Sequence, residues 1–169
     1  RQEESLKAWL RNKGKGCIEG CTGYGKTRIG LNAIERVRTK YPNLSVIVVV
    51  PTDVLREQWI KQLDKRGLGL NCKVSIINTA SKQIDQCDLL ILDEIHKFAA
   101  DQFSHVFKTV KYKLILGLTA TIERLDGKHE LIKKYCPVVD TVPIEVAKVN
   151  GWVSDFTEYQ VIITAEDID

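Results

Sequence analysis

The chain has 169 residues, 44% of them hydrophobic and 28% charged, and its formal net charge is +3 at pH 7. This length is enough for one self-contained core, and the composition excludes an intrinsically disordered chain. No run of the sequence approaches the roughly 18 apolar residues of a membrane helix, so we expect no membrane partner. The slight positive charge allows a nucleic-acid partner without arguing for one, because solvated lysines give the same sum.

The cysteines bear on the compartment. There are five, an odd number, and no two of them form a C-x-x-C pair. We therefore expect reduced thiols in an intracellular protein, cytoplasmic or, in a eukaryote, nuclear. Metal binding by Cys17 and Cys21 is the alternative, disfavoured because the sequence holds no second ligand cluster. The start at Arg1, without methionine, predicts a piece of a longer protein, and we expect this piece to be monomeric.

Helical and strand-like patterns alternate along the chain. Apolar residues at helical spacing predict helices over residues 2–12, 25–40, 54–63 and 103–110. Runs of β-branched or apolar residues predict strands over residues 15–19, 45–50, 73–77, 88–93 and 113–119. This alternation is typical of an α/β fold, in which right-handed crossovers build a mostly parallel sheet with helices on both faces.

The first motif is a glycine-rich loop between the first strand and the next helix. It matches the P-loop pattern G-x-x-x-x-G-K-[ST] in full, over Gly20, Cys21, Thr22, Gly23, Tyr24, Gly25, Lys26 and Thr27. Glycines let successive backbone N–H groups point at phosphate oxygens, Lys26 reaches the β- and γ-phosphates, and the Thr27 hydroxyl ligates Mg²⁺. The loop therefore predicts binding of a nucleoside triphosphate. A chance glycine-rich turn is the alternative.

The second motif ends the predicted strand DLLILD in Asp93-Glu94-Ile95-His96. We expect this strand to lie beside the strand that enters the P loop. Asp93 is then placed to hold Mg²⁺, directly or through a water, and Glu94 to polarise the attacking water as general base. A solvated strand end is the alternative. His105 and His129 are expected to be ordinary surface or hydrogen-bonded residues.

The third motif, GLTAT at residues 117–121, ends the last predicted strand. Its small hydroxyl side chains are suited to hydrogen-bond the His96 ring and to sense the γ-phosphate, although a plain turn has the same composition. The three tryptophans Trp9, Trp59 and Trp152 are interpreted as core residues rather than stacking platforms for bases.

Taken together, GCTGYGKT, DEIH and GLTAT, in this order and each at a strand end, resemble the first RecA-like domain of superfamily-two DExH helicases. The segments GLTATIERLDG and VVVPTDVLREQW are similar to the xeroderma-pigmentosum-B, UvsW and restriction-subunit branch, although Ile122 departs from the proline often found after TAT. The resemblance implies a RecA-like P-loop NTPase sandwich over residues 1–142. Residues 143–169 would be an extension or linker toward a second RecA-like domain of the same chain.

The resemblance also implies roles for single residues. The catalytic set would be Lys26, Asp93, Glu94 and His96, with ATP and Mg²⁺ as cofactors and with Thr27 and Asp93 toward the metal. Thr119 and Thr121 would couple hydrolysis to domain movement.

Four more residues follow from the same resemblance. Gln2 would read the adenine, although Arg1 stands where the branch usually has tyrosine, and an ordinary N-terminal polar residue is the alternative. Pro51, Thr52 and Thr79 would contact the nucleic-acid backbone, which carries no sequence information. For Thr79, a helix N-cap is the alternative.

The resulting hypothesis is the N-terminal ATP-binding motor domain of an ATP-dependent DNA helicase or translocase. Its missing second domain would supply arginine fingers, so the isolated domain is expected to bind nucleotide weakly and to hydrolyse it poorly. The alternatives are a DExH helicase acting on RNA, a P-loop kinase, and a nucleotide-responsive interaction module without turnover. A kinase needs an acceptor site and an arginine-rich lid, which the sequence does not show. A module has no physical need of Lys26, Asp93 and Glu94 together.

Overall fold

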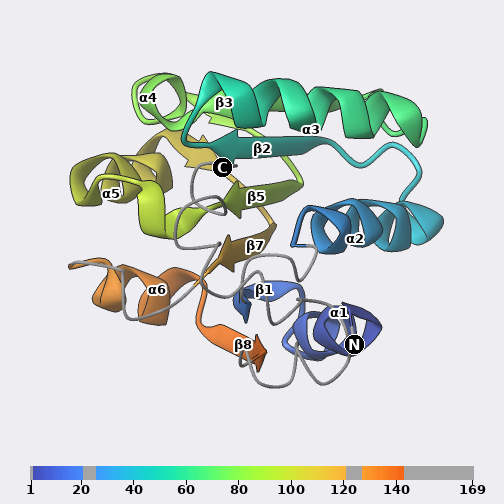
Figure 1. The fold of residues 1–169 in the computed structure, drawn as a ribbon, viewed down its shortest axis with the longest axis horizontal. Helices are drawn as coiled ribbons and strands as arrows, with labels where there is room; N and C mark the ends of the chain where they lie inside the picture. Colours follow the sequence, from blue (N-terminus) through green and yellow to red (C-terminus); the bar gives the residue numbers. More distant parts are fainter. Residues whose placement is uncertain (1, 21–25, 121–126, 143–169) are drawn as a thin grey trace, which may run out of the picture.

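The computed structural model describes residues 2–20, 26–120 and 127–142, except for the side chain of Lys26. A six-stranded sheet runs through the centre of this part, and its strands are all parallel (Figure 1). Its strands are β1 Lys15–Gly20, β2 Val46–Val50, β3 Cys72–Ile76, β5 Leu89–Asp93, β7 Leu114–Thr119 and β8 Val138–Val142. A separate pair, β4 Asp85–Gln86 and β6 Val110–Lys111, forms a second small sheet.

Helices cover both faces of the large sheet (Figure 1). They are α1 Gln2–Arg11, α2 Lys26–Lys40, α3 Asp53–Lys65, α4 Ile77–Ala80, α5 Ala100–Thr109, the 3₁₀-helix η1 Ile95–Lys97 and α6 His129–Tyr135. The predicted elements therefore exist, within a few residues of their predicted bounds. The prediction was wrong for Val110, which begins β6 rather than ending α5, and it missed α4, α6, β8 and the small sheet.

Strand β2 shows why the layers form. Val46, Val48 and Val50 pack on the side of α1, α2 and α3, whereas Ile47 and Val49 pack on the side of α4, α5 and α6. All five residues are at most 4% exposed. A strand buried on both faces has no polar alternation, which is the continuous apolar run seen in the sequence. The arrangement confirms the α/β sandwich of three layers.

The strand order corrects one expectation. The large sheet has the order β3-β2-β5-β7-β1-β8, so β5, which ends in Asp93, is not beside β1. Strand β7 lies between them, with Glu19 of β1 opposite Thr119 and Asp93 opposite Leu118. The prediction was wrong because apolar runs identify buried strands but not their neighbours. As a result, Thr119 ends the strand between the P-loop strand and the Asp93 strand.

No helix in the described ranges is both long and apolar enough to span a bilayer.

Candidate active site

Three strand ends meet at one edge of the sheet. Gly20 ends β1, Thr119 ends β7 and Asp93 ends β5, and parallel strands place their carboxyl ends on the same side. We call this the carboxyl edge, meaning these three residues and the segments that directly follow them. In open α/β sheets this edge is where ligands bind.

The P loop itself, Cys21 to Gly25, lies outside the described residues, as does Thr121. Gly20 is buried at the end of β1, and Lys26 is the first residue of α2. Thr27 follows in the first turn, half-buried, and lines a groove between α2 and α3. A helix of this length carries partial positive charge at its first turn, which favours a phosphate there.

Asp93 is the most enclosed carboxylate at this edge, with 2% exposure. The indole N–H of Trp59 donates a hydrogen bond of 2.8 Å to its Oδ2. The sequence prediction had Trp59 only as a core residue. It is core, with 1% exposure, but it also contacts the carboxylate predicted to hold magnesium.

Glu94 adopts the left-handed conformation, with φ 57° and ψ 48°. This conformation is energetically unfavourable for residues with a Cβ, and residues that adopt it concentrate at functional sites. The turn starts η1, and the buried Glu94 side chain has its Oε2 3.5 Å from His96 Nε2 and 3.7 Å from Lys97 Nζ. The predicted general base is thus held between two nitrogen groups of its own turn.

His96 connects Glu94 to the end of β7. Its Nδ1 accepts the backbone N–H of Ala120 at 3.3 Å and lies 3.2 Å from Thr119 Oγ1. In a neutral ring that accepts at Nδ1, the proton is on Nε2, which faces Glu94. The hydrogen bond expected between GLTAT and His96 is therefore present. The proposed sensing role of Thr119 stays a prediction.

Two further contacts fasten the Glu94–Phe98 turn to the rest of the domain. Gly117 lacks a Cβ where one would lie 2.8 Å from Ile95 Cδ1, so only glycine lets Ile95 pack so closely on β7. Lys128, 3% exposed, donates from Nζ to the carbonyl of Phe98 at 2.8 Å. A buried lysine is unusual, and the sequence patterns did not single it out.

The side chains at the carboxyl edge decide which kind of metal site they fit. Within the described ranges, no three or more His, Cys, Asp or Glu side chains gather as a metal cluster. The oxygens of Asp93 and Thr27 instead suit Mg²⁺, which commonly takes one or two protein ligands and completes its shell with phosphate oxygens and water. These residues fit a magnesium nucleotide rather than a metal cage made only of protein ligands.

The predicted nucleic-acid contacts lie beside this site on separate elements. Pro51 is half-buried, and the exposed Thr52 caps α3 by accepting the N–H of Leu55 at 3.2 Å. Thr79 is exposed inside α4, whose N-cap is Ile76, so the N-cap alternative for Thr79 is wrong. Gln2 is half-buried in the first turn of α1.

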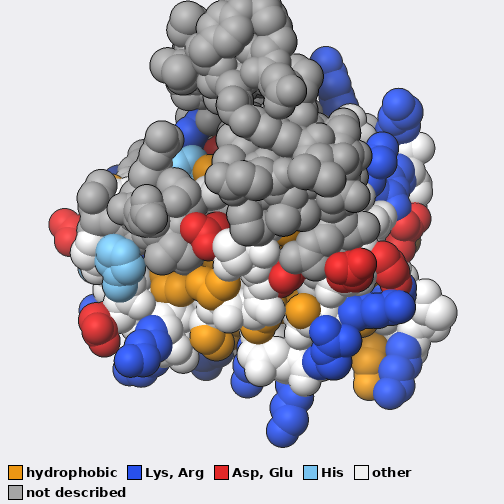
Figure 2. All heavy atoms as spheres, turned by 60° about the horizontal axis from the view of Figure 1, so that its bottom comes forward, with side chains coloured by type: hydrophobic (Ala, Val, Ile, Leu, Met, Phe, Trp, Pro, Cys, Tyr) orange, Lys and Arg blue, Asp and Glu red, His pale blue; other side chains and the backbone are white. Residues whose placement is uncertain are grey.

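Surface charge adds no separate argument for a polyanion. Figure 2 shows Lys and Arg side chains interspersed with Asp and Glu among the coloured residues of one face, without one large field of either sign. The other histidines behave as expected. His105 is exposed with its Nδ1 2.7 Å from the carbonyl of Asp101, and His129 is exposed at the start of α6.

Four cysteines lie in the described ranges, and all four are free. Cys17 and Cys136 are both buried, and a hydrogen bond between their thiols, together with burial, raises the pKa of Cys17 well above its ordinary value. Burial also raises the pKa of Cys87 to about 12. Cys21 lies outside the described residues, so its pairing with Cys17 on a metal stays untested.

The chain resembles known proteins over most of its length. A family model described as "Type III restriction enzyme, res subunit" matches residues 1–83 and 70–124. The chain is 32% identical over 146 residues to the DNA 3'-5' translocase XPB2 of Sulfurisphaera tokodaii, covering 77% of this chain and 32% of that protein. It is 29% identical over 164 residues to the putative ATP-dependent RNA helicase QP509L of African swine fever virus, covering 82% of this chain and 31% of that protein.

Solved structures agree on the fold. The UvsW helicase from bacteriophage T4 superposes with a TM-score of 0.67 at 15% identity, covering 82% of this chain and 58% of that chain. The Sulfolobus solfataricus SWI2/SNF2 ATPase core in complex with dsDNA gives 0.56 at 18% identity, covering 71% of this chain and 31% of that chain. The RecA-like fold is thereby confirmed. The chain spans about a third of the length of the two curated relatives described above.

Proposed function

Because this chain belongs to the type III restriction enzyme res-subunit family and forms the first motor domain of a superfamily-two helicase, we propose that it is the ATP-binding half of a DNA translocase. One observation carries the proposal. Asp93 ends the strand next to β7, Glu94 directly follows it, and His96 links Glu94 to Thr119 at the end of β7 itself. An acid pair and a relay to a neighbouring strand are the parts that nucleotide hydrolysis coupled to movement requires.

Nucleotide binding rests on the start of α2. Residues Gly20 to Thr27 would surround the phosphates, with the positive end of α2 behind them, and Gln2 on α1 would contact the adenine. Thr27 and Asp93 would hold Mg²⁺, which when bound neutralises phosphate charge. The remaining charge would be met by arginines of a second RecA-like domain.

Hydrolysis rests on Glu94. A general base must keep its carboxylate aimed at the attacking water while it takes the proton. The left-handed turn fixes the Glu94 backbone, and the Nε2–H of His96 faces Glu94 Oε2 at 3.5 Å. Because the His96 ring is one of the groups that hold the carboxylate, the position of the base depends on the ring, and therefore on whatever moves the ring.

Coupling rests on the other side of the same ring. His96 Nδ1 meets both the Thr119 side chain and the Ala120 backbone. A displacement of residues 119–120 by a second domain therefore moves the ring, and the ring moves the base. In our proposal, Thr119 couples hydrolysis to domain movement in this way. Thr121 would take part in the same movement.

The nucleic acid is the least determined part. Pro51, Thr52 and Thr79 would contact only its backbone. The relative from Sulfurisphaera tokodaii is named a DNA translocase, which favours duplex DNA. The relatives from African swine fever virus and from Acanthamoeba polyphaga mimivirus are named putative ATP-dependent RNA helicases, which keeps RNA as the second candidate.

The test is the ATPase rate of the full-length protein alone, with duplex DNA and with single-stranded RNA, each at two salt concentrations because phosphate binding depends on salt. Stimulation by duplex DNA is the expected result. Stimulation by RNA alone would support an ATP-driven motor but make RNA, not duplex DNA, the nucleic acid on which it moves. A protein that binds ATP without turnover under any condition would be a nucleotide-responsive module instead.

A further inference from the structure

Trp59 joins two parts of the site that lie far apart in the sequence. It sits in the middle of α3, buried to 1% exposure, and its Nε1 donates to Asp93 Oδ2 at 2.8 Å across 34 residues. Asp93 is itself only 2% exposed. In such an enclosed place a hydrogen bond to a carboxylate is stronger than at the surface and fixes the plane of the acid.

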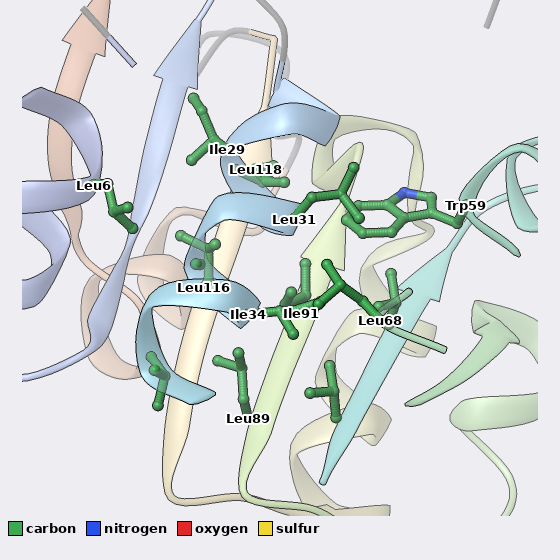
Figure 3. Close-up of a cluster of buried hydrophobic side chains, with 14 of the residues drawn as sticks. Leu6, Ile29, Leu31, Ile34, Trp59, Leu68, Leu89, Ile91, Leu116 and Leu118 are labelled. Carbon is green, nitrogen blue, oxygen red and sulfur yellow. The ribbon is translucent and has the colours of Figure 1, made fainter. Parts of the chain in front are cut away.

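The same indole lies against the P-loop helix. A Cβ on Gly30 would be 2.5 Å from Trp59 Cη2, closer than real Cβ atoms come, and 3.3 Å from its Cζ2, which is a tight contact. Gly30 is three residues after Thr27, about one helical turn. Figure 3 shows the ring reaching from α3 to the side of α2, next to Leu31. One rigid side chain thus touches the helix that carries Thr27 and the carboxylate of Asp93.

We propose that Trp59 is a positioning residue that sets Asp93 relative to Thr27 and so preorganises the magnesium site. The indole suits this task because its N–H is a neutral donor that does not give up its proton to the acid and brings no charge to compete with the metal. A partner that hydrogen-bonds a metal ligand from outside orients that ligand and tunes its affinity for the metal. The inference rests on the proposed function, since it takes Asp93 as a ligand of Mg²⁺.

The chain supplies a matched control. Trp9 is also fully buried, and its Nε1 donates at 2.8 Å, but to the backbone carbonyl of Ile115. Trp9→Phe and Trp59→Phe each keep most of the apolar volume and delete one buried indole hydrogen bond of the same length. They differ in the acceptor, which is a strand carbonyl for one and the Asp93 carboxylate for the other.

The experiment measures nucleotide affinity of the full-length protein with methylanthraniloyl-ADP as fluorescent probe, in excess Mg²⁺ and in EDTA. The quantity of interest is the ratio of the two affinities. Trp59→Phe is expected to lose roughly 10- to 100-fold of this magnesium-dependent gain, with its affinity in EDTA unchanged. Trp9→Phe should keep the wild-type ratio even if its melting temperature falls.

Two further variants protect the test against a folding defect. Gly30→Ala pushes on the ring without touching Asp93 and should lower the ratio in the same direction. Asp93→Asn should abolish the gain, and adding Trp59→Phe to it should change nothing more. Equal ratios for Trp59→Phe and Trp9→Phe would overturn the inference while leaving the proposed function intact. If the nucleotide affinity of the wild-type protein were the same in Mg²⁺ and in EDTA, both the inference and the proposed function would be overturned.

Discussion

The two edges of the sheet use polar residues in opposite ways. At the carboxyl edge, Asp93 and Glu94 are buried, and Glu94 is held in a left-handed conformation. At the amino edge, meaning Ser45, Asp88, Lys113 and residues 66–71, the ion pairs are more exposed. There Asp88 accepts the Ser45 N–H at 2.9 Å and lies 3.2 Å from the exposed Lys113 Nζ.

Arg38 shows the amino edge most clearly. Its guanidinium donates to the carbonyls of Leu44, Leu68 and Leu70, which ties the end of α2 to the loops before β2 and β3. Such contacts satisfy backbone groups where the chain turns. The carboxyl edge therefore holds its acids in place at a cost in stability, whereas ordinary hydrogen bonds stabilise the amino edge.

The largest effect should come from Glu94→Gln at the carboxyl edge. The amide cannot accept a proton as a general base, so the ATPase rate of the full-length protein should fall by roughly 10²- to 10⁴-fold. Nucleotide affinity should stay near wild type, because the substitution keeps the shape of the side chain. Steady-state hydrolysis and probe binding measured on the same preparation check this, and normal turnover would remove Glu94 from the role of base.

The next effect should come from Arg38→Met at the amino edge. Leaving three carbonyls without this donor should lower the free energy of unfolding by roughly 2–3 kcal/mol, with hydrolysis per folded molecule unchanged. Arg36→Met is the matched control, since Arg36 makes an exposed ion pair with Glu3 that is worth under about 1 kcal/mol. Urea unfolding compares the two, and equal losses would contradict the special status of Arg38.

A smaller effect on stability should come from the backbone strain at Glu94. Glycine accepts a positive φ without a Cβ clash, so Glu94→Gly should be more stable than Glu94→Ala by about 1 kcal/mol. Both variants should be inactive. At the amino edge, Asn71 has the same φ of 57°, but asparagine tolerates this conformation better. Wild-type Asn71 should therefore lie closer in stability to Asn71→Gly than wild-type Glu94 does to Glu94→Gly.

The smallest effect is a pH dependence at the amino edge. The Ser45 N–H and then the neighbouring Lys113 hold the pKa of Asp88 below its ordinary value. A lowered pKa adds stability that is present above the unfolded value near pH 4 and is lost as the pH falls through the folded value. Asp88→Asn should thus cost under about 1 kcal/mol at neutral pH, and the difference should shrink in acid. If the stability difference between wild type and Asp88→Asn grew in acid, the pKa of Asp88 would be raised on folding rather than lowered.

The sequence predicted the strands well because burial on both faces leaves a plain signal, as in Val46–Val50. It also predicted the contact of His96 with Thr119, since Thr119 ends one strand and His96 lies just after the end of another. The order of β5, β7 and β1 was not predictable in this way, because all three strands read as similar apolar runs. The two-residue strands β4 and β6 are too short to carry any period.

The contacts of two residues of the site were not predicted from the sequence, for a different reason. Trp59 falls at a helical core position and is indeed buried there, so its spacing conceals its bond to Asp93. Lys128 reads as a surface charge, and its burial depends on the Phe98 carbonyl, which lies 30 residues earlier. Contacts made across the fold by residues with an ordinary local role leave no local pattern to read.

Helix α3 has a mechanical consequence. Its cap, Thr52, belongs to the segment expected to grip nucleic acid, and Trp59 lies seven residues further along the same unbroken helix. At about 1.5 Å per residue, the two lie about 10 Å apart on one rod. A helix transmits displacement with little bending over so short a length. In our proposal, a force on the nucleic acid near Thr52 is therefore transmitted along α3 to Trp59, and from Trp59 to Asp93 as the proposed ligand of Mg²⁺.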